Sequence, residues 1–130
     1  MLLTINVGNK YIGIGVYSRD TLMASYCVNA QTERTSDEYG VLLMQLLLAK
    51  RFDLKEVDSA VIAAVDKEVE ADIKKSLKDY FRCEAMTTDV AVKDDNKNAD
   101  DYEAAFNLVE LRAFYEKNAP EEKASRGILI

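Results

Sequence analysis

The stretch LLTINVGNKYIGIGVYSRDTLMASYCV, residues 2–28, decides the fold of this chain. Three apolar runs alternate in it with two turn-forming segments, GNK at positions 8–10 and SRD at positions 18–20. Apolar residues recur at every second position in the second and third runs, which is the period of a β-strand. The sequence therefore predicts a meander of three antiparallel strands at the start of the chain.

The rest of the chain alternates helical and strand-like patterns. A capping box from Thr35 to Glu38 precedes apolar residues at helical spacing and predicts a helix to about Arg51. Residues 59–65 form a short continuous apolar run, which is typical of a strand covered on both faces. The later patterns predict a helix over 69–81, a weak strand over 84–88, a helix over 102–113, a break at Pro120 and a last strand over 128–130.

This order of elements indicates a fold class. Three antiparallel strands followed by alternating helices and strands are the order of a ribonuclease-H-like (actin-like) α/β domain. We expect a single domain of this kind over residues 1–130, a length sufficient to bury a core. The periodicity alone also permits another mixed α+β sheet.

Composition excludes several classes of function. The net charge of -6 argues against nucleic acid or an anionic membrane as the main partner, because both require an excess of Lys and Arg. No apolar run is long enough to span a bilayer, and the first residues lack the features of a signal peptide, so we expect a cytoplasmic protein. Cys27 and Cys83 are then expected to be buried, reduced thiols without a disulfide between them. The absence of histidine removes the commonest general base and zinc ligand.

Four short motifs follow one another along most of the chain. They are NVGNK at 6–10, RTSDEYG at 34–40, VIAAVD at 61–66 and NADD at 98–101. In the same order they resemble D-x-G-N-T/S, R-T-A-D-E-Y-G, V-I-S-S-V-V-P and G-A-D-R of the type III pantothenate kinases. The second motif is the most specific of the four. The chain therefore resembles the first lobe of that family.

The resemblance implies an activity and a set of sites. The activity is the ATP-dependent phosphorylation of pantothenate, the first step of coenzyme A synthesis, by a dimer of two-lobed subunits that uses ATP and a cation. The implied positions are Asp100 as the catalytic base, Gly8, Asn9 and Lys10 as the phosphate-binding hairpin, Asn6 at the metal position, and Arg34 and Asp37 as substrate ligands or as an intramolecular pair. Asp100 is also well placed to be the N-cap of the third helix.

The motifs of this chain depart from those of the family. Asn6 replaces an aspartate and has no charge with which to hold a cation, and Lys10 replaces a hydroxyl residue. A lysine at this place can still pair with a phosphate as a point charge. Alanines stand at the two serine positions of the third motif, and Asp101 replaces the arginine of the fourth. The second lobe of the family, with its D-F-G-T motif and adenosine pocket, is not found in this sequence.

Three functions are compatible with these observations. The first is a non-catalytic relative that keeps the fold and acts through contacts, as a homodimer or with another protein. The second is the first half of a split or truncated pantothenate kinase, completed by a separate second lobe. The third is a small-ligand or anion-binding module that uses the hairpin and the edge at Asp100 and Asp101.

The third predicted helix is apolar over a wide arc. Its expected sheet-facing stripe is Tyr102, Ala105, Phe106, Val109 and Ala113. Leu108 and Leu111 lie away from that stripe, so the second apolar face is expected to contact another copy of the chain. This predicts a dimer interface between Phe106 and Tyr115. The alternative is that the tail over 120–130 covers this face.

Overall fold

The computed structural model describes residues 1–89 and 101–119, with the side chains of the last helix described from residue 107 onward. The elements in chain order are β1 Leu2–Val7, β2 Tyr11–Ser18, β3 Thr21–Asn29, α1 Ser36–Ala49, the short 3-10 helix η1 Leu54–Glu56, β4 Ser59–Ala64, α2 Lys67–Phe81, β5 Met86–Thr87 and α3 Asp101–Asn118. None of the described helices is long and apolar enough to cross a membrane. The predicted break at Pro120 and the predicted last strand over 128–130 lie outside the described residues.

One five-stranded sheet organises the fold, with the strand order β3-β2-β1-β4-β5. β1, β2 and β3 pair antiparallel, which confirms the predicted meander. β4 lies parallel to β1 on its other side, and β5 lies parallel to β4. Parallel neighbours need a crossover connection, and α1 and α2 provide the two crossovers. The predicted actin-like α/β fold is confirmed.

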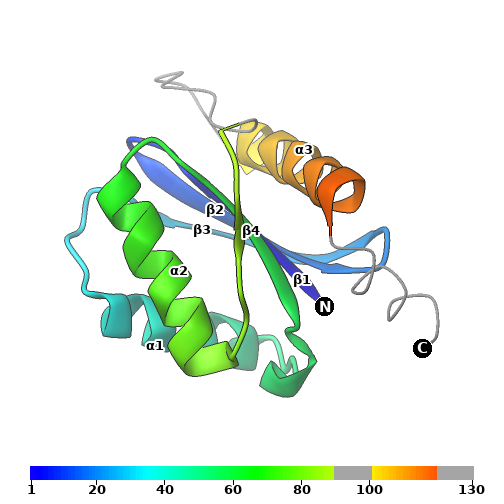
Figure 1. Ribbon diagram of the computed structural model, residues 1–130, viewed down its shortest axis with the longest axis horizontal. Coiled ribbons are helices and arrows are strands. Elements are labelled where there is room, and N and C mark those ends of the chain that lie inside the picture. The colour runs from blue at the N-terminus through cyan, green and yellow to red at the C-terminus, as the bar shows by residue number, and fades with distance from the viewer. Residues whose placement is uncertain (90–100, 120–130) are drawn as a thin grey trace.

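Helices cover both faces of this sheet (Figure 1). Because successive side chains of a strand point to opposite faces, Leu3, Ile5 and Val7 of β1 join the core beneath α1 and α2. Leu2 of the same strand joins a second cluster with Leu108 and Leu111 of α3. β1 and β4 are therefore buried along their whole length, as the continuous apolar run over 59–65 predicts.

The predicted capping box begins α1. The Thr35 hydroxyl accepts from the Glu38 amide at 3.2 Å, and the Glu38 carboxylate accepts from the Thr35 amide at 2.9 Å. Tyr39, Leu43 and Leu47 are buried, and Leu42 and Leu46 are partly buried. The predicted core-facing side of this helix is confirmed.

The stripe predicted for α3 is wrong. Leu108 and Leu111 face the sheet with 1% and 0% exposure, whereas Val109 is 50% exposed and Ala113 is exposed. Because α3 is apolar over much of its circumference, helical spacing alone could not select the side that packs. Gly15 on β2 makes room for the side of α3 that carries Leu108. A Cβ at this glycine would lie 3.0 Å from Leu108 Cδ1 and 2.6 Å from Thr4 Oγ1. The missing side chain lets α3 approach the sheet closely.

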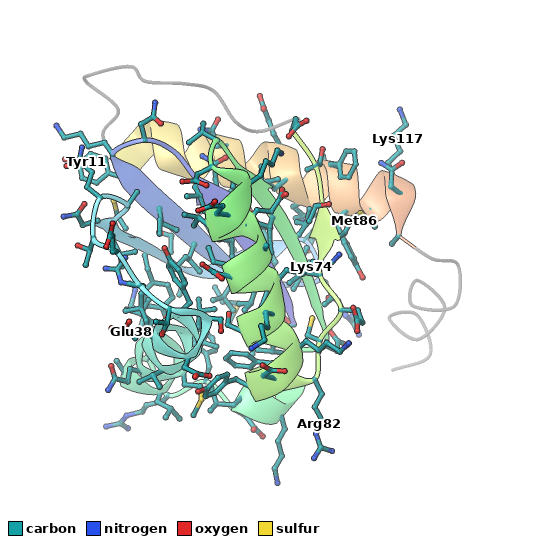
Figure 2. The ribbon with its side chains drawn as sticks, turned by 60° about the vertical axis from the view of Figure 1, so that its left-hand side comes forward. Tyr11, Glu38, Lys74, Arg82, Met86 and Lys117 are labelled. Carbon is teal, nitrogen blue, oxygen red and sulfur yellow. The ribbon has the colours of Figure 1, made fainter. Side chains whose placement is uncertain are left out.

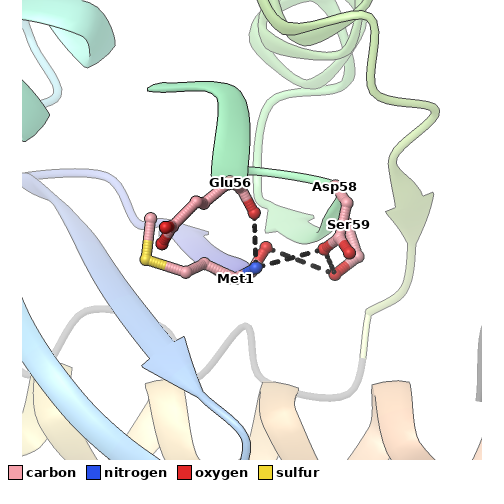
Figure 3. Close-up of polar contacts among 4 residues, drawn as sticks. All are labelled: Met1, Glu56, Asp58 and Ser59. Atoms are coloured by element: carbon pink, nitrogen blue, oxygen red, sulfur yellow. Dashed lines mark hydrogen bonds and ion pairs between the residues drawn. The ribbon is translucent and has the colours of Figure 1, made fainter. Parts of the chain in front are cut away.

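The first residue is tied to the loop that precedes β4. The Met1 amine donates to the Glu56 carbonyl and pairs with the Asp58 carboxylate at 3.2 Å (Figure 3). The Ser59 hydroxyl lies 3.5 Å from the Met1 carbonyl, to which it donates. These contacts fix the start of β1 beside β4, and so support the parallel pairing of the two central strands.

The cysteines differ in their surroundings. Both are thiols, and Cys83 is buried, as expected. Cys27 is exposed, which corrects the expectation of a buried residue. Its strand, β3, lies at the edge of the sheet, and most of its residues are exposed or half-buried.

Candidate functional site

The sequence motifs meet where β1 and β4 end. Asn6 is paired with Gly13 of β2 on one side and with Ala63 of β4 on the other. The Val65 amide continues the pairing by donating to the Val7 carbonyl at 3.0 Å. The hairpin at 8–10 follows directly. Ligands of open α/β sheets bind outside the carboxyl ends of the strands, so this edge is the candidate site.

The last helix begins at the same end of the molecule. Figure 2 shows Tyr11, the residue after the hairpin, near the first turn of α3, while Lys117 lies at the opposite end of that helix. Asp100, the candidate catalytic base, lies outside the described residues, and α3 begins at the next residue.

Asn6 is a buried amide with an unsatisfied acceptor. Its neighbours Ile5 and Val7 face α1 and α2, so its side chain lies on the α3 face of the sheet. Asn6 is 6% exposed, and its Oδ1 has no hydrogen-bond partner among the described residues. Asn107 of α3 is 5% exposed, and its Oδ1 likewise has no partner there. The layer between the sheet and α3 thus contains two buried carboxamides.

The cation that the family implies does not fit these residues. Mg²⁺ is normally held by one or two carboxylates together with phosphate oxygens and water. No cluster of acidic or thiol side chains that could hold a metal ion is present in the described part of the chain. The position of the family's aspartate holds the neutral side chain of Asn6. We therefore assign no step of chemistry to a cation here.

The hairpin at 8–10 already uses one of its amide donors internally. The Gly8 N–H donates to the Tyr11 carbonyl at 2.9 Å, so it is not directed at a phosphate. No described glycine has a positive φ, so the turn does not depend on glycine for its conformation. The Lys10 ammonium lies 5.4 Å from the centre of the Tyr11 ring in a cation–π contact. Of the three predicted phosphate ligands, the exposed Lys10 is best suited to meet an anion.

Arg34 and Asp37 have separate structural partners. The Arg34 guanidinium donates to the Asn29 carbonyl at 2.8 Å and lies over the Tyr39 ring. The Asp37 carboxylate accepts from the Tyr80 hydroxyl of α2 at 3.0 Å, and this bond raises the pKa of Tyr80. The two residues therefore anchor α1 to β3 and to α2, rather than pairing with each other. Both belong to the α1 side of the sheet, whereas the Asn6 side chain faces α3.

Three structural roles were not expected from the sequence. Asp66 caps α2 by accepting from the amides of Glu68 and Val69. Tyr80 covers Gly40, because a Cβ at that glycine would lie 2.3 Å from the tyrosine ring. Asn107 is buried. The only feature of the sequence that could have indicated this burial is its position between the apolar residues Phe106 and Leu108.

The fold has a counterpart among solved structures. A protein from Bacteroides thetaiotaomicron, described as having an actin-like ATPase fold and unknown function, matches 83% of this chain and 36% of its own length. The TM-score is 0.52 at 13% sequence identity, so the match concerns the fold alone. The chain is thus a domain of the actin-like ATPase fold.

Sequence comparison identifies the family. The profile of type III pantothenate kinase matches residues 2–105. The type III pantothenate kinase of Myxococcus xanthus is 36% identical over 93 residues, which are 72% of this chain and 36% of that protein. The enzyme of Paramagnetospirillum magneticum is 37% identical over 86 residues, 66% of this chain and 33% of its own length. This chain belongs to the type III pantothenate kinase family, and its match spans about a third of the length of these curated relatives.

Proposed function

We propose that this chain is a non-catalytic member of the type III pantothenate kinase family that acts through contacts with other protein chains. The observation that carries the proposal is the buried, neutral Asn6 at the place of the family's metal-binding aspartate. Phosphoryl transfer depends on positioning and on charge stabilisation from several sides at once. An uncharged amide at this place cannot supply the anionic ligand that such a site needs.

The state of the hairpin also supports this proposal. Its Gly8 amide is bonded within the turn, and Lys10 contributes only a solvent-facing charge. The R-T-S-D-E-Y-G motif, the most specific link to the family, has partners on β3 and α2 that hold α1 in place. The fold of the first lobe is thereby kept, while the groups described around its active edge offer little catalysis.

The direct test measures ATP-dependent phosphorylation of pantothenate by the purified chain. The Myxococcus xanthus relative, assayed in parallel, is the positive control. We expect no turnover above the rate without protein, and clear steady-state activity of this chain would overturn the proposal.

A second candidate follows from the partial match to the relatives. The chain corresponds to about a third of their length, so it could serve as the first lobe of a split kinase that binds ATP and a cation together with a separate second lobe. Asp100 would then be the base. Co-expression with the remaining two-thirds of the Myxococcus xanthus enzyme tests this candidate. Restored phosphorylation that is lost on Asp100→Asn would establish it in place of the first proposal.

A further inference from the structure

The outer edge of β3 is the longer of the two sheet edges in the described part of the chain. The strand order β3-β2-β1-β4-β5 places β3 and β5 at the two ends of the sheet. β3 has nine residues, whereas β5 has two. Natural sheets often protect an edge by making its strand short, and β5 fits this description. β3 does not, so its outer edge is a surface to which another strand could add.

The sequence of β3 is also suited to pairing with other strands. The segment from Leu22 to Val28 contains no charged residue, proline or glycine. Uncharged segments of about six or seven residues without proline are the ones that readily form intermolecular sheets. Leu22 is 38% exposed and Met23 is 53% exposed, so the core does not cover this segment completely. The folded chain therefore needs another way to protect this edge.

Alternate residues of β3 direct their backbone groups away from β2. The Ala30 N–H donates to the Lys10 carbonyl at 3.0 Å, just beyond the end of β3. Hydrogen-bonded and non-hydrogen-bonded positions alternate along an antiparallel pair. Ser25 and Asn29 are each separated from Ala30 by an odd number of positions, so their carbonyls point outward. A strand added to this edge would need these carbonyls as acceptors.

Two cationic side chains from the ends of α1 already occupy both carbonyls. The Lys50 ammonium donates to the Ser25 carbonyl at 3.4 Å, and the Arg34 guanidinium donates to the Asn29 carbonyl at 2.8 Å. Lys50 is the C-cap of α1, and Arg34 directly precedes its N-cap. The helix thus places one cation at each end of a stretch of edge that is about 13 Å long.

An aromatic ring lies beneath each of these cations. The Lys50 ammonium is 4.6 Å from the centre of the Tyr26 ring, and the Arg34 guanidinium is 5.7 Å from the centre of the Tyr39 ring. Cation–π contacts restrict long side chains that otherwise sample many rotamers. Both cations are therefore positioned against the edge of β3.

We propose that Arg34 and Lys50 close the outer edge of β3 to the addition of another strand. Charged side chains, lysine above all, are a common means of protecting a sheet edge. An incoming strand would have to displace two hydrogen-bond donors and leave two cations beside its own backbone. This role goes beyond the anchoring of α1, because it determines what β3 can bind. The partner contacts of the proposed function would then use a different surface.

The first test measures whether a strand adds to the edge once both cations are removed. The probe is a fluorescent peptide with the sequence of β3, residues 21–29, carrying Cys27→Ser. Arg34→Met combined with Lys50→Met keeps long apolar side chains and removes both donors. We expect this variant to bind the peptide at least about tenfold more tightly than the parent chain does, by fluorescence anisotropy. Equal binding by the parent chain would overturn the proposal.

A matched control separates edge protection from the loss of net charge. Lys74 on α2 and Lys117 on α3 are both exposed, so Lys74→Met combined with Lys117→Met removes the same charge and adds the same apolar side chains elsewhere. This control should bind the peptide as weakly as the parent chain. A gain in binding equal to that of the first variant would assign the effect to charge and overturn the proposal.

Urea unfolding and circular dichroism separate edge protection from the anchoring of α1. Surface contacts of this kind contribute little to stability, so we expect the variant without Arg34 and Lys50 to remain folded. If it is folded but binds no more peptide than the parent, the two residues only anchor the helix and the proposal is wrong. Should it fail to fold, Lys50→Met alone exposes the Ser25 carbonyl and is judged by the same two outcomes. These measurements use neither ATP nor pantothenate, so their result is independent of the proposed function.

Discussion

At Asn6 this chain has a neutral amide where its family has an aspartate. A carboxylate at this buried position would need a cation or another charge beside it, and no cluster of side chains that could hold a cation is found among the described residues. We predict that Asn6→Asp lowers the free energy of unfolding at pH 7 by at least about 1 kcal/mol. Burial would raise the pKa of the new carboxyl above its unfolded value, so the loss should appear as the pH rises through that folded pKa.

Urea unfolding with and without Mg²⁺ measures this effect. Asn107→Asp is the matched control, because it buries the same charge in the same layer from α3. Both variants should be destabilised to a similar degree in either condition. If Mg²⁺ restored the stability of Asn6→Asp alone, the geometry of a cation site would have survived, contrary to our interpretation.

Tyr17 is a second single residue whose contribution to stability can be tested. Its ring is 3% exposed and lies beside the Arg112 guanidinium, but its hydroxyl has no hydrogen-bond partner among the described residues. Tyr17→Phe keeps the ring and removes the unpaired group. We therefore expect the variant to be as stable as the parent at neutral pH or more stable by about 1 kcal/mol.

The same substitution should change the alkaline limb of the stability curve. Burial raises the pKa of Tyr17, with a smaller opposing effect from Arg112. The folded state therefore favours the neutral phenol, and this contribution is lost as the pH rises through the folded pKa. The advantage of Tyr17→Phe should grow above about pH 10. Tyr11→Phe, at an exposed position, is the control and should leave the curve unchanged.

The contact between α1 and α2 is the feature that matters at the scale of elements. Gly40 lies beneath the Tyr80 ring, and the Tyr80 hydroxyl bonds to Asp37 one turn earlier on α1. Alanine normally favours a helix over glycine by about 1 kcal/mol. Here its Cβ would lie 2.3 Å from the ring, so we expect Gly40→Ala to destabilise the protein by about 1–3 kcal/mol.

A double-mutant cycle isolates this contact. Tyr80→Ala removes the obstructing ring, so Gly40→Ala should cost much less in that background. Gly8→Ala is the control, since a Cβ at Gly8 meets only the Tyr11 carbonyl, at 3.4 Å. Chemical denaturation supplies all the values. If Gly40→Ala were neutral in both backgrounds, close helix packing would not be the reason for the glycine.

At the scale of the whole molecule, the described residues form one layer of sheet between two layers of helix. We predict that neither ATP with Mg²⁺ nor pantothenate stabilises the chain. No cluster of side chains that could hold a metal ion is found among the described residues, and of the two exposed lysines at this edge Lys67 is already paired with Glu70 and Asp89, which leaves Lys10. A ligand at a hundredfold excess over its dissociation constant would add about 2.7 kcal/mol, which a thermal-shift assay detects. Stabilisation by ATP or inorganic phosphate that is lost on Lys10→Ala would instead support the anion-binding module.

The sequence by itself determined the elements and the family. Period-two patterns and turn residues defined the meander, and the capping box fixed the start of α1, because these signals act between neighbouring residues. The motif order identified the family for the same reason, since each motif is read locally.

Tertiary structure alone decided which groups meet. The pattern of α3 could not show that Leu108 and Leu111 face the sheet, because that choice depends on the space left by Gly15 on a distant strand. The motif around Arg34 and Asp37 could not reveal that Arg34 donates a hydrogen bond to Asn29 and that Asp37 accepts one from Tyr80. Contacts between residues far apart in sequence follow from packing, and packing has no period along the chain.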